Sequence, residues 1–215
     1  MRLLFLTHYF PPEVNAPATR TYEHCKRWVK AGHKITVLTC VPNAPNAKIF
    51  AGYRNKVIQK EIMDGITVIR LWSFIAANSR FFPRVINYVS SMLMMTLYVL
   101  FSKQRYDRLI ATSPQFFTGW AGMVISIFRK KPFILEIRDI WPESILAVGA
   151  MKKSFIIKLL EKMEITMYKR ADRIITVGNG YRDNIIQKGI PPEKISVITN
   201  GVDLDQFNPE KYAYS

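Results

Sequence analysis

The segment IRDIWPES, which contains Arg138 and Asp139, combines charged and aromatic residues directly after an apolar run. An arginine guanidinium is planar and can hold two phosphate oxygens at once, so Arg138 is a candidate phosphate ligand. Trp141 offers an aromatic face on which a sugar or an apolar lipid segment could stack. A structural interpretation is also open, in which Asp139 caps the next helix and Arg138 pairs with Glu136 or Glu143.

A second polar segment, HYFPPEVNAPATR, follows the apolar run RLLFLT near the N-terminus. A structural turn needs only Pro and Gly, whereas this segment also carries Glu13, Asn15 and Arg20. His8 comes directly after the apolar run, where a role toward a ligand and a hydrogen-bonded structural role are both open. We expect these side chains to lie near the mouth of the sheet to which the run belongs.

The pattern of apolar residues predicts the elements that must position these side chains. Seven short runs rich in β-branched residues recur with helical segments between them, which is typical of an α/β domain. The runs are residues 2–7, 34–40, 66–72, 107–113, 133–139, 172–178 and 194–200. Several are continuously apolar, as expected when helices cover both faces of a parallel sheet. We therefore predict a Rossmann-like, doubly wound, mostly parallel seven-stranded sheet with helices on both faces.

The expected helices and one hairpin complete this outline. The first helix should begin near Pro17 and stop at Gly32. The other helices are expected at about 84–103, 115–129, 152–170 and 180–189. Asp64-Gly65 is a strong hairpin signal, so an additional strand near 56–63 should pair antiparallel with the run that follows it.

In such a sheet the carboxyl ends of the parallel strands meet at one edge, where ligands bind. Polar clusters follow five of the predicted strands, at residues 8–20, 113–115, 138–144, 178–180 and 200–203. The chain contains no GxGxxG, GxxxxGK[ST], HExxH or GxSxG motif, so the dinucleotide, P-loop, metalloprotease and serine-hydrolase classes lack their minimal residues. Its three histidines are too scattered to suggest a metal site.

The composition favours a globular domain that associates with polyanions. The chain has 31 Lys and Arg against 16 Asp and Glu, which gives a formal charge of +15. The basic residues are spread along the whole chain without a recognisable nucleic-acid-binding module, so no specific nucleic acid is expected. Two cysteines without metal-ligand spacing are typical of thiols in a reducing cytosol. The apolar run near the N-terminus is too short for a secretory signal.

Two segments could contact a membrane. Residues 85–101 are largely apolar and have basic residues on both sides. Three interpretations are open: a helix buried against a sheet, a helix partly inserted into a bilayer surface, and a membrane-spanning helix. The 17 residues are fewer than the roughly 20 apolar residues that a spanning helix needs. Residues 151–170 form a basic amphipathic stretch, which is either a core helix with solvated lysines or a membrane-docking helix.

The string NGVD at the end of the last predicted strand resembles a motif of a known protein family. With HYFPPE, AGH, DGI, RDIWPES and ADRIITV in this order, the whole chain resembles the N-terminal half of a retaining glycosyltransferase of family four with the GT-B fold. HYFPPE and RDIWPES are most similar to the bacterial subgroup that builds capsule, O-antigen or colanic-acid-like polysaccharides. That subgroup includes transferases of aminodeoxysugars such as N-acetylfucosamine.

The resemblance implies roles for the rim residues. In the family the loop after the first strand faces the interdomain cleft, near the donor diphosphate and the acceptor. Many members carry a Gly-Gly pair in this loop where this chain has Asn15-Ala16, and a His-Asp pair where it has Arg138-Asp139. An arginine cannot act as a general base at neutral pH, so the role of the family's histidine is not carried over to Arg138. The resemblance implies Asp139 as the catalytic residue. The residues expected to face the acceptor or the donor phosphates are His8, Glu13, Asn15, Ala16, Arg20, Arg138, Trp141, Glu143, Asn179 and Asn200.

The resemblance also implies an activity and partners. A nucleotide-sugar donor, a polyprenyl-diphosphate-linked or saccharide acceptor and an anionic membrane surface are expected, with no metal or other cofactor. Residues 1–203 would form the acceptor-side domain, and 204–215 would begin a linker to a C-terminal donor-binding domain. The isolated chain should then be inactive, and the enzyme should lie in the cytoplasm, peripheral on the inner face of the plasma membrane. A non-catalytic acceptor-binding or membrane-recruiting subunit of a split GT-B enzyme is the alternative.

Overall fold

A computed structural model describes residues 1–76, 81–113, 115–147, 149 and 154–201 of the 215-residue chain. Eight strands form one sheet in the order β3-β4-β2-β1-β5-β6-β7-β8. All neighbouring strands are parallel except the hairpin pair of β3 with β4. The predicted fold class is therefore confirmed, and the eighth strand is the additional hairpin strand that the Asp64-Gly65 signal indicated.

The strands are short and occupy the predicted runs. Their bounds are Arg2–Leu6 (β1), Lys34–Cys40 (β2), Ile58–Met63 (β3), Ile66–Leu71 (β4), Arg108–Ser113 (β5), Phe133–Ile137 (β6), Arg173–Thr176 (β7) and Ile195–Val197 (β8). Asp64 and Gly65 join β3 to β4 with φ angles of 47° and 78°. Positive φ at both central residues is what a tight two-residue hairpin of matching twist requires.

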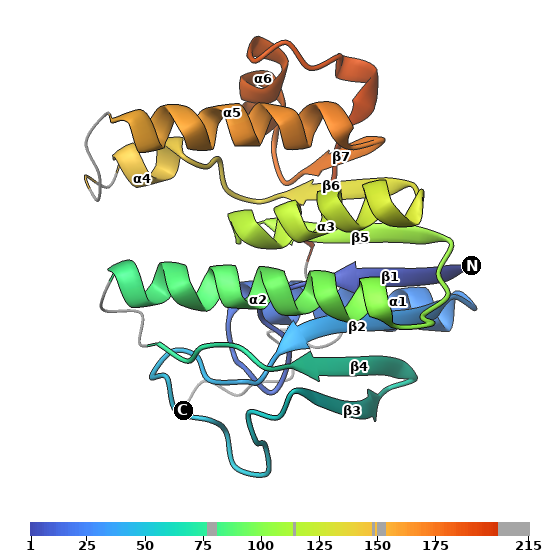
Figure 1. Cartoon of the computed structure of the whole chain (residues 1–215). Coiled ribbons are helices and arrows are strands. Elements are labelled where there is room, and N and C mark those ends of the chain that lie inside the picture. Colours follow the sequence, from blue (N-terminus) through green and yellow to red (C-terminus); the bar gives the residue numbers. More distant parts are fainter. Residues whose placement is uncertain (77–80, 114, 148, 150–153, 202–215) are drawn as a thin grey trace, which may run out of the picture.

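Helices cover both faces of the sheet, but unequally. Helix α1, Ala16–Lys30, lies on one face, and α2, α3 and α5 lie side by side on the other (Figure 1). The remaining bounds are Phe81–Phe101 (α2), Phe116–Arg129 (α3), Glu143–Ala147 (α4), Phe155–Arg170 (α5) and Asn179–Gln187 (α6). All except the short helix α4, which was not predicted, lie within a few residues of the predicted helices. Residues 151–153 and 202–215, which the predictions also covered, lie outside the described part.

Two apolar clusters fill the space between the sheet and its helices. The alternate side chains of each strand point to opposite faces, so Phe5 and Val37 pack with Cys25 and Trp28 of α1. On the other face Leu4, Leu6, Leu38 and Ile69 pack with the inner sides of the helical layer. This double burial explains why the strands are continuously apolar in sequence.

Helix α3 approaches the sheet more closely than an ordinary side chain would permit. A Cβ atom at Gly122 would lie 2.7 Å from the Cβ of Ala111 and 2.7 Å from the ring of Phe133. At Gly119 it would lie 2.6 Å from the Sδ atom of Met167 and 3.2 Å from a methyl group of Leu135. The two glycines therefore allow contact between the helix and strands β5 and β6.

The order of the strands creates the edge at which ligands are expected. The chain runs from β1 outward to β2 and β4, then returns through α2 to place β5 on the other side of β1. Connections therefore leave the carboxyl ends of β1 and β5 in opposite directions. Such a switch point leaves a crevice in open α/β sheets.

The close packing of α3 predicts a stability difference between two glycine substitutions. Gly122→Ala should lower the free energy of unfolding by about 1–3 kcal/mol because its methyl group meets the side chains of Ala111 and Phe133. Gly180→Ala in α6 has nothing within 4 Å and should be neutral or stabilising by up to about 1 kcal/mol. Urea unfolding of both variants measures the difference, and equal effects would contradict it.

Candidate functional site

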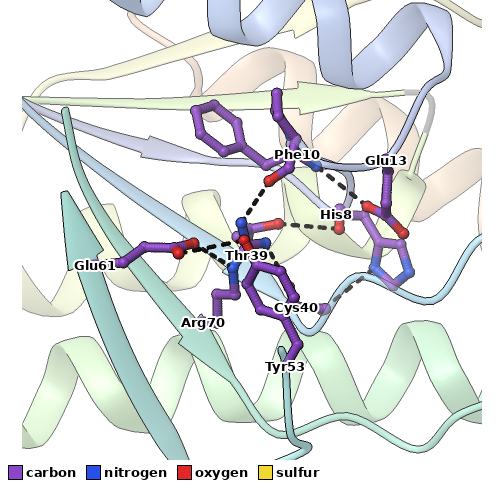
Figure 2. Close-up of polar contacts among 9 residues, drawn as sticks. His8, Phe10, Glu13, Thr39, Cys40, Tyr53, Glu61 and Arg70 are labelled. Atoms are coloured by element: carbon purple, nitrogen blue, oxygen red, sulfur yellow. Dashed lines mark hydrogen bonds and ion pairs between the residues drawn. The ribbon is translucent and has the colours of Figure 1, made fainter. Parts of the chain in front are cut away.

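The loop after β1 is fixed by the buried carboxylate of Glu13. Its oxygens accept hydrogen bonds from the backbone N–H groups of Phe10 (3.3 Å), Asn43 (3.0 Å) and Ala44 (2.9 Å), and part of this arrangement is visible in Figure 2. Burial raises the pKa of Glu13, while these three donors and the charge of Arg70 oppose the rise. Glu13 was expected to face a ligand, but its side chain points into the protein, where it joins the loops after β1 and β2.

Arg70 of β4 also binds the loop after β1. Its Nε donates to Glu61 Oε1 at 2.6 Å, and its other nitrogens donate to the carbonyl oxygens of Pro11 and Cys40. The guanidinium also lies over the ring of Tyr53, 4.7 Å from the centroid (Figure 2). Arg70 is only 1% exposed, so its charge is balanced within the protein and not by water.

His8 is also an interior residue. Its Nδ1 lies 3.3 Å from Ser91 Oγ and 3.7 Å from Cys40 Sγ, and its carbonyl oxygen accepts a hydrogen bond from Thr39. Burial lowers the pKa of His8 to about 4, so the imidazole is neutral at physiological pH. The structure thus selects the hydrogen-bonded structural role over the ligand role, because the ring is enclosed between the strand ends and α2.

Asn15 and Ala16 begin helix α1 at the carboxyl edge. The side-chain oxygen of Asn15 accepts a hydrogen bond from the N–H of Ala18 at 2.9 Å, so Asn15 is the N-cap. Ala16, the first helical residue, is exposed. The two residues lie at the edge where they were expected, and the Asn15 oxygen is occupied by the cap.

Arg20 joins three parts of the carboxyl edge. Its Nε donates to Glu136 Oε1 of β6 at 3.0 Å, and its remaining nitrogens donate to the side chain of Asn200 and the carbonyl oxygen of Ile198. The Arg20 and Glu136 side chains are only 8% and 4% exposed. A cavity of about 140 Å³ lies beside this pair, lined mainly by apolar side chains such as Trp28.

Arg138 and Asp139, directly after β6, keep polar atoms without partners. The Nη1 atom of Arg138 is buried and has no hydrogen-bond partner in the described part of the chain. Burial lowers the pKa of Arg138, with Glu136 opposing this effect and Arg20 adding to it, yet a guanidinium stays protonated at neutral pH. The Asp139 carboxylate makes no hydrogen bond or ion pair with the described residues, while its carbonyl oxygen accepts from Ser113 of β5 at 3.5 Å.

The structure therefore contradicts the interpretation in which Asp139 caps a helix and Arg138 forms an ion pair with Glu136 or Glu143. Glu136 pairs with Arg20 and not with Arg138. Glu143 pairs with Lys188 of α6, at 3.0 Å, and accepts a hydrogen bond from Asn184 at 2.9 Å. These contacts leave the guanidinium of Arg138 available to a ligand, and they turn Glu143 toward α6.

Trp141 takes part in the packing of the protein interior, whereas Asn179 is exposed. Trp141 stacks on Phe116 of α3, with ring centroids 6.0 Å apart and an interplanar angle of 17°. One face of its indole is thus engaged in packing. Asn179 is the exposed first residue of α6, after the Gly178 N-cap, and lies at the carboxyl edge as expected.

Two residues that organise the edge were not among the predicted site residues. Arg70 and Glu136 each interrupt an apolar strand, in ITVIRL and FILEI. A charge within a run that is buried on both faces is a signal of a paired interior ion, and it could have identified both. Within the described residues, no group of three or more His, Cys, Asp or Glu could hold a metal ion, and metal independence stays a prediction.

The topology and the edge residues define the class of fold, a Rossmann-like half of the GT-B architecture. The chain is similar to Anabaena HepE in complex with UDP-glucose, with a TM-score of 0.56, 14% identity and coverage of 98% of this chain and 47% of HepE. Sucrose-phosphate synthase from Thermosynechococcus elongatus matches with a TM-score of 0.56 and 10% identity, and the match covers 98% of this chain and 95% of the synthase structure. UDP-N-acetylglucosamine 2-epimerase from Rickettsia bellii matches with a TM-score of 0.51 and 12% identity, and the match covers 98% of this chain and 48% of the epimerase.

Residues 17–206 match Glycosyltransferase Family 4, and the chain belongs to this family. It is a glycosyltransferase domain that spans about half the length of the HepE structure it resembles. A search of curated proteins gave no significant match.

Burial should separate two ion pairs with the same N–O distance. Arg70–Glu61 and Arg2–Asp107 both measure 2.6 Å, but the Arg70 side chain is 1% exposed and that of Arg2 is 47% exposed. Arg70→Met should lower the free energy of unfolding by about 3–5 kcal/mol, since it leaves a carboxylate and two carbonyl oxygens without their donor. Arg2→Met should have a much smaller effect, because water screens the pair. Urea unfolding that ranks the variants equally would contradict this assignment.

The buried imidazole of His8 predicts a dependence of stability on pH. The unfolded chain binds this proton near pH 6.5 and the folded chain only near pH 4, so the free energy of unfolding falls as pH drops through that window. The full loss is roughly 3 kcal/mol. A His8→Gln variant should lack this component, which the difference between its unfolding curves and those of the parent protein measures from pH 7 to pH 4. Titration of the His8 ring by NMR with a midpoint near pH 6.5 would contradict the prediction without any variant.

Proposed function

We propose that the complete protein is a retaining glycosyltransferase that transfers a sugar from a nucleotide-sugar to a lipid-linked or saccharide acceptor. The observation that carries the reaction class is the match to Glycosyltransferase Family 4 over residues 17–206. The likeness to the HepE structure, which was solved in complex with UDP-glucose, supports a nucleotide-sugar as donor.

The free polar atoms after β6 support the assignment of residues to roles. Arg138, with its unpartnered Nη1, is suited to hold phosphate oxygens and to stabilise the charge that develops on the leaving diphosphate. Asp139 is the proposed catalytic carboxylate, since it is free to accept a hydrogen bond from a sugar hydroxyl. Retention would follow if the leaving phosphate oxygens assist attack by the acceptor hydroxyl while the protein positions the reactants. No metal is required in this scheme.

The donor pocket is proposed to come from a second half of the protein in cis. In support, the chain spans about half the length of HepE. By this proposal the present chain provides the acceptor side and has little transferase activity alone. The opening motifs and the basic charge of +15 favour a role in bacterial surface polysaccharide synthesis, with the enzyme in the cytoplasm against the inner face of the plasma membrane.

Sugar transfer by the complete protein tests these roles. Asp139→Asn and Arg138→Gln should each lower kcat at least about a hundredfold, because each removes an interaction with the reacting diphosphate or hydroxyl. Asp183→Asn serves as a matched control, since that side chain is 53% exposed on α6 and pairs with Arg182. NMR of the first-formed product should show the anomeric configuration of the donor.

Either of two results would overturn the proposal. An inverted product would exclude the retaining mechanism. Wild-type turnover in both edge variants, with unchanged folding, would remove Arg138 and Asp139 from the site while leaving the family assignment intact.

A further inference from the structure

Helix α2 carries apolar side chains on its outward side as well as on its inward side. Inward, Tyr88, Met95 and Val99 are buried in the core. The outward set, 46% to 84% exposed, is Ile86, Leu93, Leu97 and Phe101. Spacings of seven, four and four residues place this set along one stripe of the helix. Core packing explains the first set and leaves the second unexplained.

The inward side of α2 is fixed to the rest of the domain. Asn87 donates to the carbonyl oxygen of Phe74, and Ser91 lies 3.0 Å from Cys40 Sγ. At the other end Arg129 of α3 donates to the carbonyl oxygen of Val99 at 3.1 Å. The window Phe82–Phe101 is long and apolar enough to span a membrane by composition, with a mean hydropathy of 1.3 and 28% of it buried. With these contacts in place, α2 can offer a membrane only its outward side.

The neighbouring helices extend the exposed apolar surface. On α3, Ile127 and Phe128 are 49% and 68% exposed, next to the end of α2. On α5, Phe155, Ile156 and Leu159 are 81%, 55% and 48% exposed. Helices α2, α3 and α5 lie side by side in one layer (Figure 1). Their inward residues, such as Met95, Ile125 and Met167, are buried in one core cluster, so the exposed residues lie on the part of the layer that faces away from the sheet. We call this set, with the stripe on α2, the helical-layer surface.

The charges around the helical-layer surface are almost all positive. Between Gly65 and Leu135 the only acidic residue in the sequence is Asp107, which pairs with Arg2. Exposed basic residues flank the ends of α2 and α3, and α5 adds two more beside the exposed Glu161. They are Lys103, Arg105, Lys130, Lys158 and Lys162. Apolar groups surrounded by lysines and arginines suit an anionic interface, whereas a second copy docked through the same surface would bring like charges together.

We propose that the helical-layer surface binds an anionic lipid bilayer, with α2 parallel to the membrane plane and its outward side chains among the headgroups and upper acyl chains. The contact itself needs no sugar transfer, but its use rests on the proposed function. Helices α2 and α5 begin after the carboxyl ends of β4 and β6. Docking in this orientation therefore leaves the carboxyl edge, which carries Arg138 and Asp139, open along the membrane plane, so that a lipid-linked diphosphate acceptor can extend to it from the headgroups.

Vesicle binding by the full chain tests the proposal. The protein should sediment with vesicles of phosphatidylcholine and phosphatidylglycerol, bind weakly to phosphatidylcholine alone and be released by high salt. The double variant Leu93→Gln, Leu97→Gln should lower the partition coefficient about tenfold or more, because two apolar side chains no longer leave water. Val14→Gln, Ile198→Gln is the matched control, since these residues are 94% and 47% exposed and precede α1 or follow β8.

Three results would overturn the proposal. They are no binding to either vesicle, an equal loss of binding in the control pair, and a stable dimer in solution that the leucine variant dissociates, which would assign the surface to a second copy. Transfer to a water-soluble acceptor by the complete protein separates this question from the proposed function. The leucine variant should retain that activity, and absence of transfer in the parent protein would refute the proposed function while leaving the vesicle result unaffected.

Discussion

The carboxyl edge depends on two buried charges that hold the loop after β1 in place. Glu13 gathers backbone N–H groups from two loops, and the guanidinium of Arg70 binds the carbonyl oxygen of Pro11 in the same loop. Loops with Pro at several positions have few internal hydrogen bonds, so side chains must supply the missing partners. The start of α1, and with it Arg20, is positioned by these contacts, because the loop leads directly into the helix.

The charged residues of the edge fall into two groups that differ in what satisfies them. Glu13, Arg20, Arg70 and Glu136 are largely buried and bind protein atoms, although the Oε2 atom of Glu136 has no partner among the described residues. Those contacts resist rearrangement, since a buried charge without its partner is strongly destabilising. Around Arg138, polar atoms remain unsatisfied, which is unusual for buried groups and is the pattern expected where a ligand completes the hydrogen bonding. The first group gives the second a rigid frame.

The fold could be predicted from the sequence because its signals are local and repeated. Apolar runs, the Asp64-Gly65 turn and the glycine after α1 each define an element without knowledge of the others. The side-chain roles could not be predicted in the same way. Whether His8 and Glu13 face a ligand or the interior depends on α2 and on the loop after β2, which lie far away in sequence. The matches to other proteins leave the roles of Arg138 and Asp139 untested, and these stay predictions.

The order of strands has a consequence for how the chain assembles during synthesis. From β1 the sheet grows outward on one side through β2 and β4 with the β3 hairpin, and then on the other through β5, β6, β7 and β8 in the order of the sequence. Each new strand except β3, which must wait for β4, can therefore pair as it emerges, without displacing an earlier one. The hydrogen bond from Arg20 to Asn200 spans 180 residues, so during synthesis it can form only after all eight strands have been made. Its formation would report, in a folding experiment, the closure of the completed edge.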